Sequence, residues 1–225
     1  MSSREIIPLS QRIDAVIFDM DGLMLDTERL HLEHFRKAAN DFGYSELEDV
    51  YLQSVGLNSR DTERLFHRSY GPAFPYVDIR DRWRQYAEVH IRQFGVPHKS
   101  GLLSLLETLE PLGFSKAVAT STRKHNAIVL LEKVRILHHF KTVVGGDEVS
   151  KGKPDPEIFL TAADRLKVDP KRCVVFEDSP AGIRGAHAAG MIPILVPDLI
   201  EPPPDIRELA WRVLASLEEA PSLFQ

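Results

Sequence analysis

Residues 16–28 read VIFDMDGLMLDTE, and this stretch decides the fold. Three apolar residues, 16–18, end in Asp19, and a second aspartate, Asp21, follows two positions later, directly before Gly22. Two carboxylates so close together repel each other and resist the loss of water. A chain keeps such a pair where it binds a cation or carries out chemistry, so we expect a functional site at the end of a buried strand.

Short apolar runs rich in Val and Ile recur along the chain. They do not alternate with polar residues, which is typical of strands buried on both faces of a parallel sheet. The expected strands are residues 15–18, 117–119, 142–144, 173–176 and 192–196. Helical patterns follow at residues 102–112, 124–139, 157–166 and 181–189. This alternation predicts an α/β fold, a doubly wound, Rossmann-like parallel sheet.

The segment between the first two strands breaks this alternation. It contains helical patterns separated by glycines, at residues 27–42, 46–53, 60–70 and 77–94. We therefore predict an all-helical cap domain, residues 26–96, inserted into a catalytic core made of residues 1–25 and 97–225. The expected hinges are residues 25–27 and 95–99.

Composition excludes several classes of function. The chain has 225 residues and a net charge of −5, which argues against broad binding of nucleic acid or an anionic membrane. Its one cysteine, Cys173, allows no intrachain disulfide, and we expect it to be a small buried hydrophobe. The N-terminal stretch is charged before any apolar run, and no run approaches the roughly 18 apolar residues that span a bilayer. We expect no signal peptide, no membrane partner and a cytoplasmic location.

Polar residues follow the predicted strands, and ligands of a parallel sheet bind at the carboxyl ends of its strands. Asp19 and Asp21 face the same side because residues two apart do so in an extended chain. Glu177 and Asp178 follow the fourth core strand. Oxygen ligands from Asp19, Asp178 and a nearby carbonyl suit Mg²⁺, which keeps several waters and also binds substrate phosphate.

These carboxylates suit phosphoryl transfer. One carboxylate can attack phosphorus, and a second can protonate the leaving alcohol and then take a proton from water. The metal would keep Asp19 ionised, and a position away from the metal would let Asp21 hold a proton.

Hydroxyl and ammonium groups complete the expected site. Thr120, Ser121 and Thr122 follow the second core strand, and Lys153 precedes a predicted helix. Hydroxyls, backbone N–H groups and a lysine bind phosphate oxygens. Residues 120–122 also have the composition of a helix N-cap, and both roles are compatible.

Residues 19–27, DMDGLMLDT, resemble the first motif, DxDGxxxDT, of the haloacid dehalogenase superfamily of phosphotransferases. Thr120 matches its second motif, Lys153 its third, and Glu177-Asp178 its acidic fourth. The helical insert resembles the small cap of the subgroup that contains β-phosphoglucomutase and many sugar-phosphate phosphatases. GKPDPEIF at 152–159 and FEDSPAGI at 176–183 are close to the usual sequences of that subgroup.

The resemblance implies catalytic and metal-binding roles. Asp19 would be the nucleophile and a metal ligand. Asp21 would be the general acid and base and would offer its backbone carbonyl to the metal. Asp178 would complete the Mg²⁺ site, with Glu177 supporting it directly or through water.

The resemblance also implies how substrate binds. Thr120, the Ser121 amide and Lys153 would bind the transferring phosphoryl group. His31 lies on the first cap helix, where relatives of the mutase type carry a histidine facing the active site, although an exposed helical histidine is an alternative. Independently of the resemblance, Arg60 is a candidate for binding a distal group of the substrate, with a charge at a helix start as the alternative.

The expected function is a Mg²⁺-dependent phosphatase of a small phosphorylated metabolite, a sugar phosphate, acting as a monomer through an aspartyl-phosphate. The alternative is a β-phosphoglucomutase-type phosphomutase. That subgroup carries an Arg-rich signature in its cap, and residues 54–60 of this chain match that signature poorly. A dehalogenase would not need Asp21. A non-catalytic binding protein would not need all four motifs.

Overall fold

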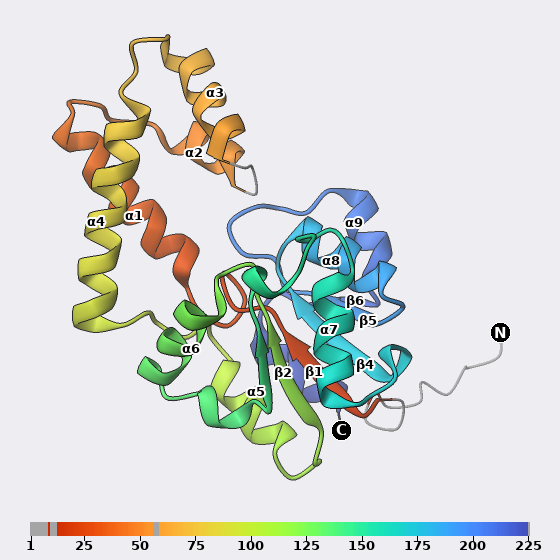
Figure 1. Cartoon of the computed structure of the whole chain (residues 1–225). Coiled ribbons are helices and arrows are strands. Elements are labelled where there is room, and N and C mark those ends of the chain that lie inside the picture. Colours follow the sequence, from red (N-terminus) through yellow and green to blue (C-terminus); the bar gives the residue numbers. More distant parts are fainter. Residues whose placement is uncertain (1–8, 10–12, 56–58, 225) are drawn as a thin grey trace. The chain divides into compact units, whose positions relative to one another are not determined.

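The computed structural model describes residues 9, 13–55 and 59–224. The chain forms two compact units, one made of Met1–Leu25 and Pro97–Gln225 and the other of Asp26–Val96. Figure 1 colours the elements of both units along the sequence. That the second unit acts as a cap stays a prediction.

The first unit contains a six-stranded parallel sheet in the order β3-β2-β1-β4-β5-β6 (Figure 1). Its strands are β1 Ala15–Phe18, β2 Ser115–Ala119, β3 Thr142–Val144, β4 Cys173–Glu177, β5 Ile192–Leu195 and β6 Arg212–Val213. The predicted doubly wound α/β fold is confirmed. The chain builds β2 and β3 on one side of β1 and then returns to place β4 on the other side. The topological switch point, where such sheets bind ligands, therefore lies between β1 and β4.

The sheet is covered by α5 Leu102–Leu109, α6 Lys124–Lys133, α7 Glu157–Leu166, α8 Pro180–Ala188 and α9 Pro204–Leu209. The predicted helix 124–139 is too long. Arg135 adopts a left-handed φ of 62°, and the N–H groups of Arg135 and Ile136 donate to Glu132 and Leu131 carbonyls. This is a Schellman end, which satisfies the last helical carbonyls and stops α6. A short 3₁₀ helix, Leu137–His139, follows.

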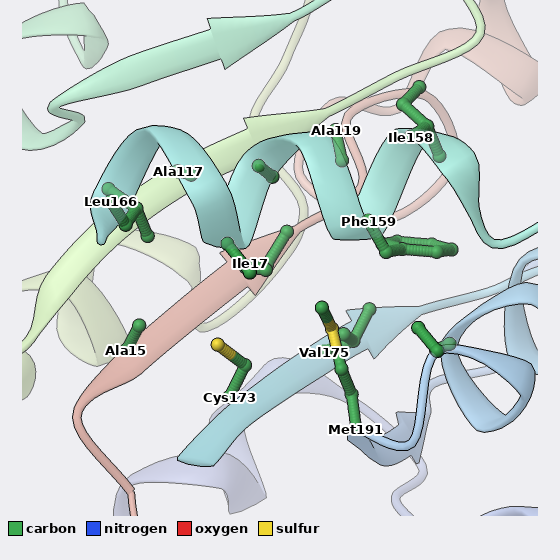
Figure 2. Packing of buried hydrophobic residues seen from close by; sticks show 14 of the residues in the cluster. Ala15, Ile17, Ala117, Ala119, Ile158, Phe159, Leu166, Cys173, Val175 and Met191 are labelled. Atoms are coloured by element: carbon green, nitrogen blue, oxygen red, sulfur yellow. The ribbon is translucent and has the colours of Figure 1, made fainter. Parts of the chain in front are cut away.

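The core of the sheet unit lies between α7 and strands β1, β2 and β4. Figure 2 shows Phe159 of α7 in the same buried cluster as Ile17 of β1 and Val175 of β4. Cys173 is fully buried in the same cluster, and burial raises the pKa of its thiol to about 12. The prediction that this cysteine is a buried hydrophobe is confirmed.

The second unit has helices α1 Thr27–Asp41, α2 Glu48–Ser54, α3 Ser59–Tyr70 and α4 Tyr76–Phe94. Its two long helices, α1 and α4, pack against each other. Aromatic rings with centroids 4.8–5.9 Å apart pack together in this unit: Phe35, Tyr51, Phe66, Tyr76 and Trp83. Nowhere in the described chain does a helix have the length and apolar character needed to cross a membrane.

Glu148 ties three segments of the sheet unit together. Its carboxylate accepts hydrogen bonds from Lys124, Arg165 and the Gly145 N–H. The bonds from Arg165, with those from Lys124 and Gly145 and against the opposing effect of burial, lower the pKa of Glu148 to about 2. Since the unfolded pKa is higher, this stabilisation is complete above about pH 4.5 and is lost as pH falls toward 2.

We expect Glu148→Gln to lower the free energy of unfolding by about 1 kcal/mol at pH 7, because the site is partly solvated. This difference in the free energy of unfolding should shrink at pH 3, where Glu148 is protonated in the unfolded wild-type chain. Urea unfolding of both proteins from pH 7 to pH 3 measures this. A difference that stays constant over that range would contradict the assignment.

Candidate active site

Three strand ends meet at one edge of the sheet. Asp19 directly follows β1, and its N–H donates to the Phe176 carbonyl of β4 at 3.0 Å. Thr120 directly follows β2, and its N–H donates to the Val144 carbonyl at 3.0 Å. Glu177 is the last residue of β4 and is fully buried. The polar groups predicted to share this edge therefore do so.

Lys153 lies in the loop before α7 and joins all three of these strand ends. Its Nζ donates to Asp19 Oδ1, to Glu177 Oε1 at 2.6 Å and to the Ala119 carbonyl at 3.0 Å. The ammonium also lies 5.1 Å from the centre of the Phe159 ring. Although burial disfavours its charge, the two carboxylates raise the pKa of Lys153. Lys153 is thus a fixed cation, and its ammonium group lies against the Phe159 ring of the apolar core.

Asp19, Glu177 and Asp178 form an acidic cluster in which one oxygen from each residue lies within 4.8 Å of the others. Glu177 already uses both oxygens, because Oε1 accepts from Lys153 and Oε2 accepts from Ser179 N and Oγ at 2.8 and 2.9 Å. Asp19 and Asp178 are therefore the better placed ligands for a cation. Glu177 chiefly holds Lys153 in position.

The positive charge of Lys153 does not fully offset the negative charges of the acidic cluster. Burial raises the pKa of Asp19 to about 8; Lys153 opposes this, while Glu177 and Asp21 add to it. Burial, followed by Glu177 and Asp19, raises the pKa of Asp178 well above its ordinary value. A divalent cation would stabilise the ionised forms of Asp19 and Asp178, and the all-oxygen donor set fits Mg²⁺.

Gly22 lies against the acidic cluster, where a side chain would not fit. Its φ is +80°, and a Cβ there would lie 2.3 Å from Asp178 Oδ2. Only a residue without a side chain lets the loop after β1 approach Asp178 so closely. The loop therefore brings the Asp21 backbone next to the acidic cluster.

Asp21 accepts two hydroxyl hydrogen bonds on Oδ2, from Thr122 Oγ1 at 2.7 Å and from Thr120 Oγ1 at 3.2 Å. The Thr122 N–H in turn donates to Thr120 Oγ1 at 3.0 Å. The structure thus brings Thr120 and Thr122 to Asp21. Ser121 lies between them and is exposed.

The prediction that residues 120–122 cap the next helix is wrong. Helix α6 begins at Lys124, and Arg123 occupies the N-cap position without a side-chain cap. The Lys124 N–H donates instead to Asp147 Oδ1 at 2.8 Å. Because a distant aspartate caps α6, the hydroxyls of Thr120 and Thr122 can bind Asp21.

His31 and Arg60 belong to the helical unit. His31 packs edge-on against Trp83, with ring centroids 5.5 Å apart, and Arg60 is exposed in the first turn of α3. Their predicted substrate contacts stay predictions. Residues 54–60, whose poor match to the mutase signature disfavours a mutase, include 56–58, which lie outside the described residues.

The helical unit contains a cavity of about 210 Å³ that sequence reasoning missed. Its lining combines aromatic rings with charged and hydroxyl side chains: Glu28, Phe35, Tyr51, Ser54, Val55, Thr62, Phe66, Tyr76, Arg80, Trp83 and Arg84. The Trp83 indole N–H is buried and meets no hydrogen-bond partner among the described residues. Such mixed lining is typical of small-molecule sites.

Sequence reasoning also missed Lys99 and Asp198, an ion pair 2.5 Å apart at the same edge of the sheet. Asp198 could have been found, because it lies two residues after the apolar run 192–196 that contains β5. Lys99 lies in the segment that returns from the helical unit, and no pattern marks it.

The fold and the site define the class: an α/β enzyme core with carboxylates and a buried lysine at its switch point. A family model for haloacid dehalogenase-like hydrolases matches residues 16–196. The chain belongs to that family, and the predicted resemblance is confirmed.

Named relatives agree in sequence and in structure. The chain is 34% identical to a phosphorylated carbohydrates phosphatase of Thermotoga maritima over 80% of this chain and 82% of the relative. It is 32% identical to the fructose-1-phosphate phosphatase YqaB of Escherichia coli, over 80% and 95%. The crystal structure of CbbY from Rhodobacter sphaeroides in complex with phosphate is similar, with a TM-score of 0.69, 27% identity and coverage of 92% and 96%.

Proposed function

We propose that this protein is a Mg²⁺-dependent phosphatase that hydrolyses a small sugar phosphate through an aspartyl-phosphate. The observation that carries the proposal is the position of Asp19, which accepts a hydrogen bond from Lys153 and belongs to the acidic cluster, with Asp21 two residues away. The relatives named as phosphatases of phosphorylated carbohydrates and of fructose 1-phosphate support it.

In the first step, an oxygen of Asp19 attacks phosphorus and the bond from phosphorus to the sugar oxygen breaks. Asp21 gives its proton to that oxygen, so the product leaves as an alcohol. Lys153 neutralises charge on the phosphoryl oxygens. The Thr120 and Thr122 hydroxyls hold the Asp21 side chain in one orientation.

In the second step, the Asp21 carboxylate takes a proton from water, which attacks phosphorus. The bond between phosphorus and Asp19 breaks, inorganic phosphate leaves, and Asp19 is again a carboxylate. Asp21 therefore ends the cycle protonated, as it began.

Asp19, Asp178 and the Asp21 carbonyl would hold Mg²⁺, with Glu177 in support. When bound, the ion keeps Asp19 ionised and offsets negative charge on the phosphoryl group. This agrees with the raised pKa values of Asp19 and Asp178.

A phosphate-release screen tests the proposal. We expect sugar phosphates to be hydrolysed with Mg²⁺, and we expect EDTA to reduce the rate to background and added Mg²⁺ to restore it. Nucleotides and phosphoglycolate serve as comparison substrates. Release of no phosphate from any ester, or an undiminished rate in EDTA, would overturn the proposal.

A phosphomutase would use the same aspartates, with a sugar hydroxyl in place of water. β-Glucose 1-phosphate separates the two functions. Formation of glucose 6-phosphate identifies a mutase, and release of free phosphate identifies the proposed phosphatase.

We further propose that the cavity of the helical unit is a binding site for a small sugar ligand. The buried Trp83 N–H and the Arg84 guanidinium, which forms no ion pair among the described residues, are donors at its wall. Sugar oxygens are acceptors for both groups, and the aromatic rings cover the apolar face of a sugar.

The cavity can be tested by fluorescence, because the chain has two tryptophans and Trp211→Phe leaves Trp83 as the single reporter. In a Trp211→Phe, Asp19→Asn protein, which cannot turn over, we expect a sugar phosphate to change Trp83 emission. Adding Arg84→Met should weaken that binding about tenfold, the loss of one charged hydrogen bond. Arg82→Met, an exposed neighbour outside the cavity lining, is the matched control. Saturable binding without any change in emission would contradict the assignment.

A further inference from the structure

A second buried ion pair lies beside the acidic cluster, within the sheet unit. Lys99 Nζ is 2.5 Å from Asp198 Oδ1, and these side chains are only 15% and 3% exposed. Burying two charges carries a desolvation cost that their attraction alone often fails to offset. The pair is therefore weak evidence for stability, and its position suggests another role.

Gly22 connects this pair to the acidic cluster. A Cβ on Gly22 would lie 2.3 Å from Asp178 Oδ2 and 3.5 Å from Asp198 Oδ2. Asp178 and Asp198 thus both lie against the same glycine. Asp198 binds Lys99 through Oδ1 and has Oδ2 toward Gly22, next to the acidic cluster.

The backbone links the same segments. The Lys99 N–H donates to the Met24 carbonyl at 2.9 Å, and Leu25 forms backbone bridges with both Asp21 and His98. On the other side, the Val196 N–H donates to the Glu177 carbonyl at 2.8 Å. The Lys99–Asp198 pair therefore joins the loop after β1 to the segment after β5, and both border the acidic cluster.

Resting on the proposed function, we infer that Lys99 and Asp198 form a positioning pair for the Mg²⁺ site. Asp198 accepts hydrogen bonds from waters that Mg²⁺ retains, and Lys99 holds that carboxylate in orientation. Mg²⁺ in proteins keeps several waters, and groups around the direct ligands change metal affinity by about 10–100-fold. Neither residue touches the reacting atoms.

Isothermal titration of Mg²⁺ into the metal-stripped full chain tests this without measuring activity. If charge alone mattered, Asp198→Asn would weaken binding and Lys99→Met, which removes a positive charge, would tighten it. Positioning predicts instead that both substitutions raise the Kd, by about tenfold or more. Lys99→Arg keeps the ion pair and should stay close to wild type.

The exposed Arg184–Asp205 pair provides the control, and Asp205→Asn should leave the Kd unchanged. Tighter Mg²⁺ binding by Lys99→Met, or an unchanged Kd in both variants, overturns the inference. The proposed function still stands in that case if phosphate release by the wild type depends on Mg²⁺. A wild-type chain that binds no Mg²⁺ overturns both. If Asp198→Asn fails to fold by circular dichroism, the comparison of Lys99→Met with Lys99→Arg decides.

Discussion

Asp19→Asn is expected to lower kcat for a sugar phosphate by at least about 10⁴-fold, the scale of losing a covalent nucleophile. The amide has nearly the same shape but cannot attack phosphorus. It removes one of the two carboxylates that hold Lys153, and Glu177 still accepts from that lysine at 2.6 Å. The fold and the affinity for phosphate esters should therefore persist while turnover is lost.

Two measurements make this prediction sharp. Acid-quenched mass spectrometry of wild type during turnover should find a phosphoryl group on the peptide that contains Asp19, and the variant should show none. Asp164→Asn, an exposed aspartate on α7 of the same unit, should keep wild-type activity. Substantial turnover by Asp19→Asn protein that is free of deamidation would rule out this nucleophile.

The large elements of the fold were predictable because each has a repeated pattern. β1 begins and ends where its apolar run does, since a strand buried on both faces needs apolar residues throughout. β6 was missed because its two residues, Arg212 and Val213, show no pattern. It forms because the neighbouring Trp211 and Leu214 N–H groups donate to the Pro193 and Leu195 carbonyls. Such pairing depends on tertiary contacts.

The candidate site was predictable to the extent that it obeys the strand-end rule. Asp19, Thr120 and Glu177 stand directly at strand ends, so the topology alone brings them together. The partners within the site were not predictable. Which oxygen of Glu177 binds Lys153, and which hydroxyl reaches Asp21, depends on side-chain geometry that no spacing encodes.

Asp21→Asn is expected to separate the two chemical steps. For a sugar phosphate, kcat should fall by about 10²–10⁴-fold, the usual contribution of a general acid or base. The Asn carbonyl can still accept from the Thr122 hydroxyl, which lies 2.7 Å from Asp21 Oδ2, so the position of the side chain should be kept. The loss would then report the missing proton transfer.

The leaving group decides whether this interpretation is right. p-Nitrophenolate leaves without needing a proton, so formation of the aspartyl-phosphate from p-nitrophenyl phosphate should stay fast in Asp21→Asn, whereas its hydrolysis still lacks a base. Stopped-flow absorbance should show a burst of about one equivalent of p-nitrophenolate followed by slow turnover. An equal loss in the first step for both esters would mean that Asp21 only positions its neighbours. A burst with the activated ester alone would mean that Asp21 is both the acid of the first step and the base of the second. Formation of the aspartyl-phosphate would then stay fast only where the leaving group needs no proton.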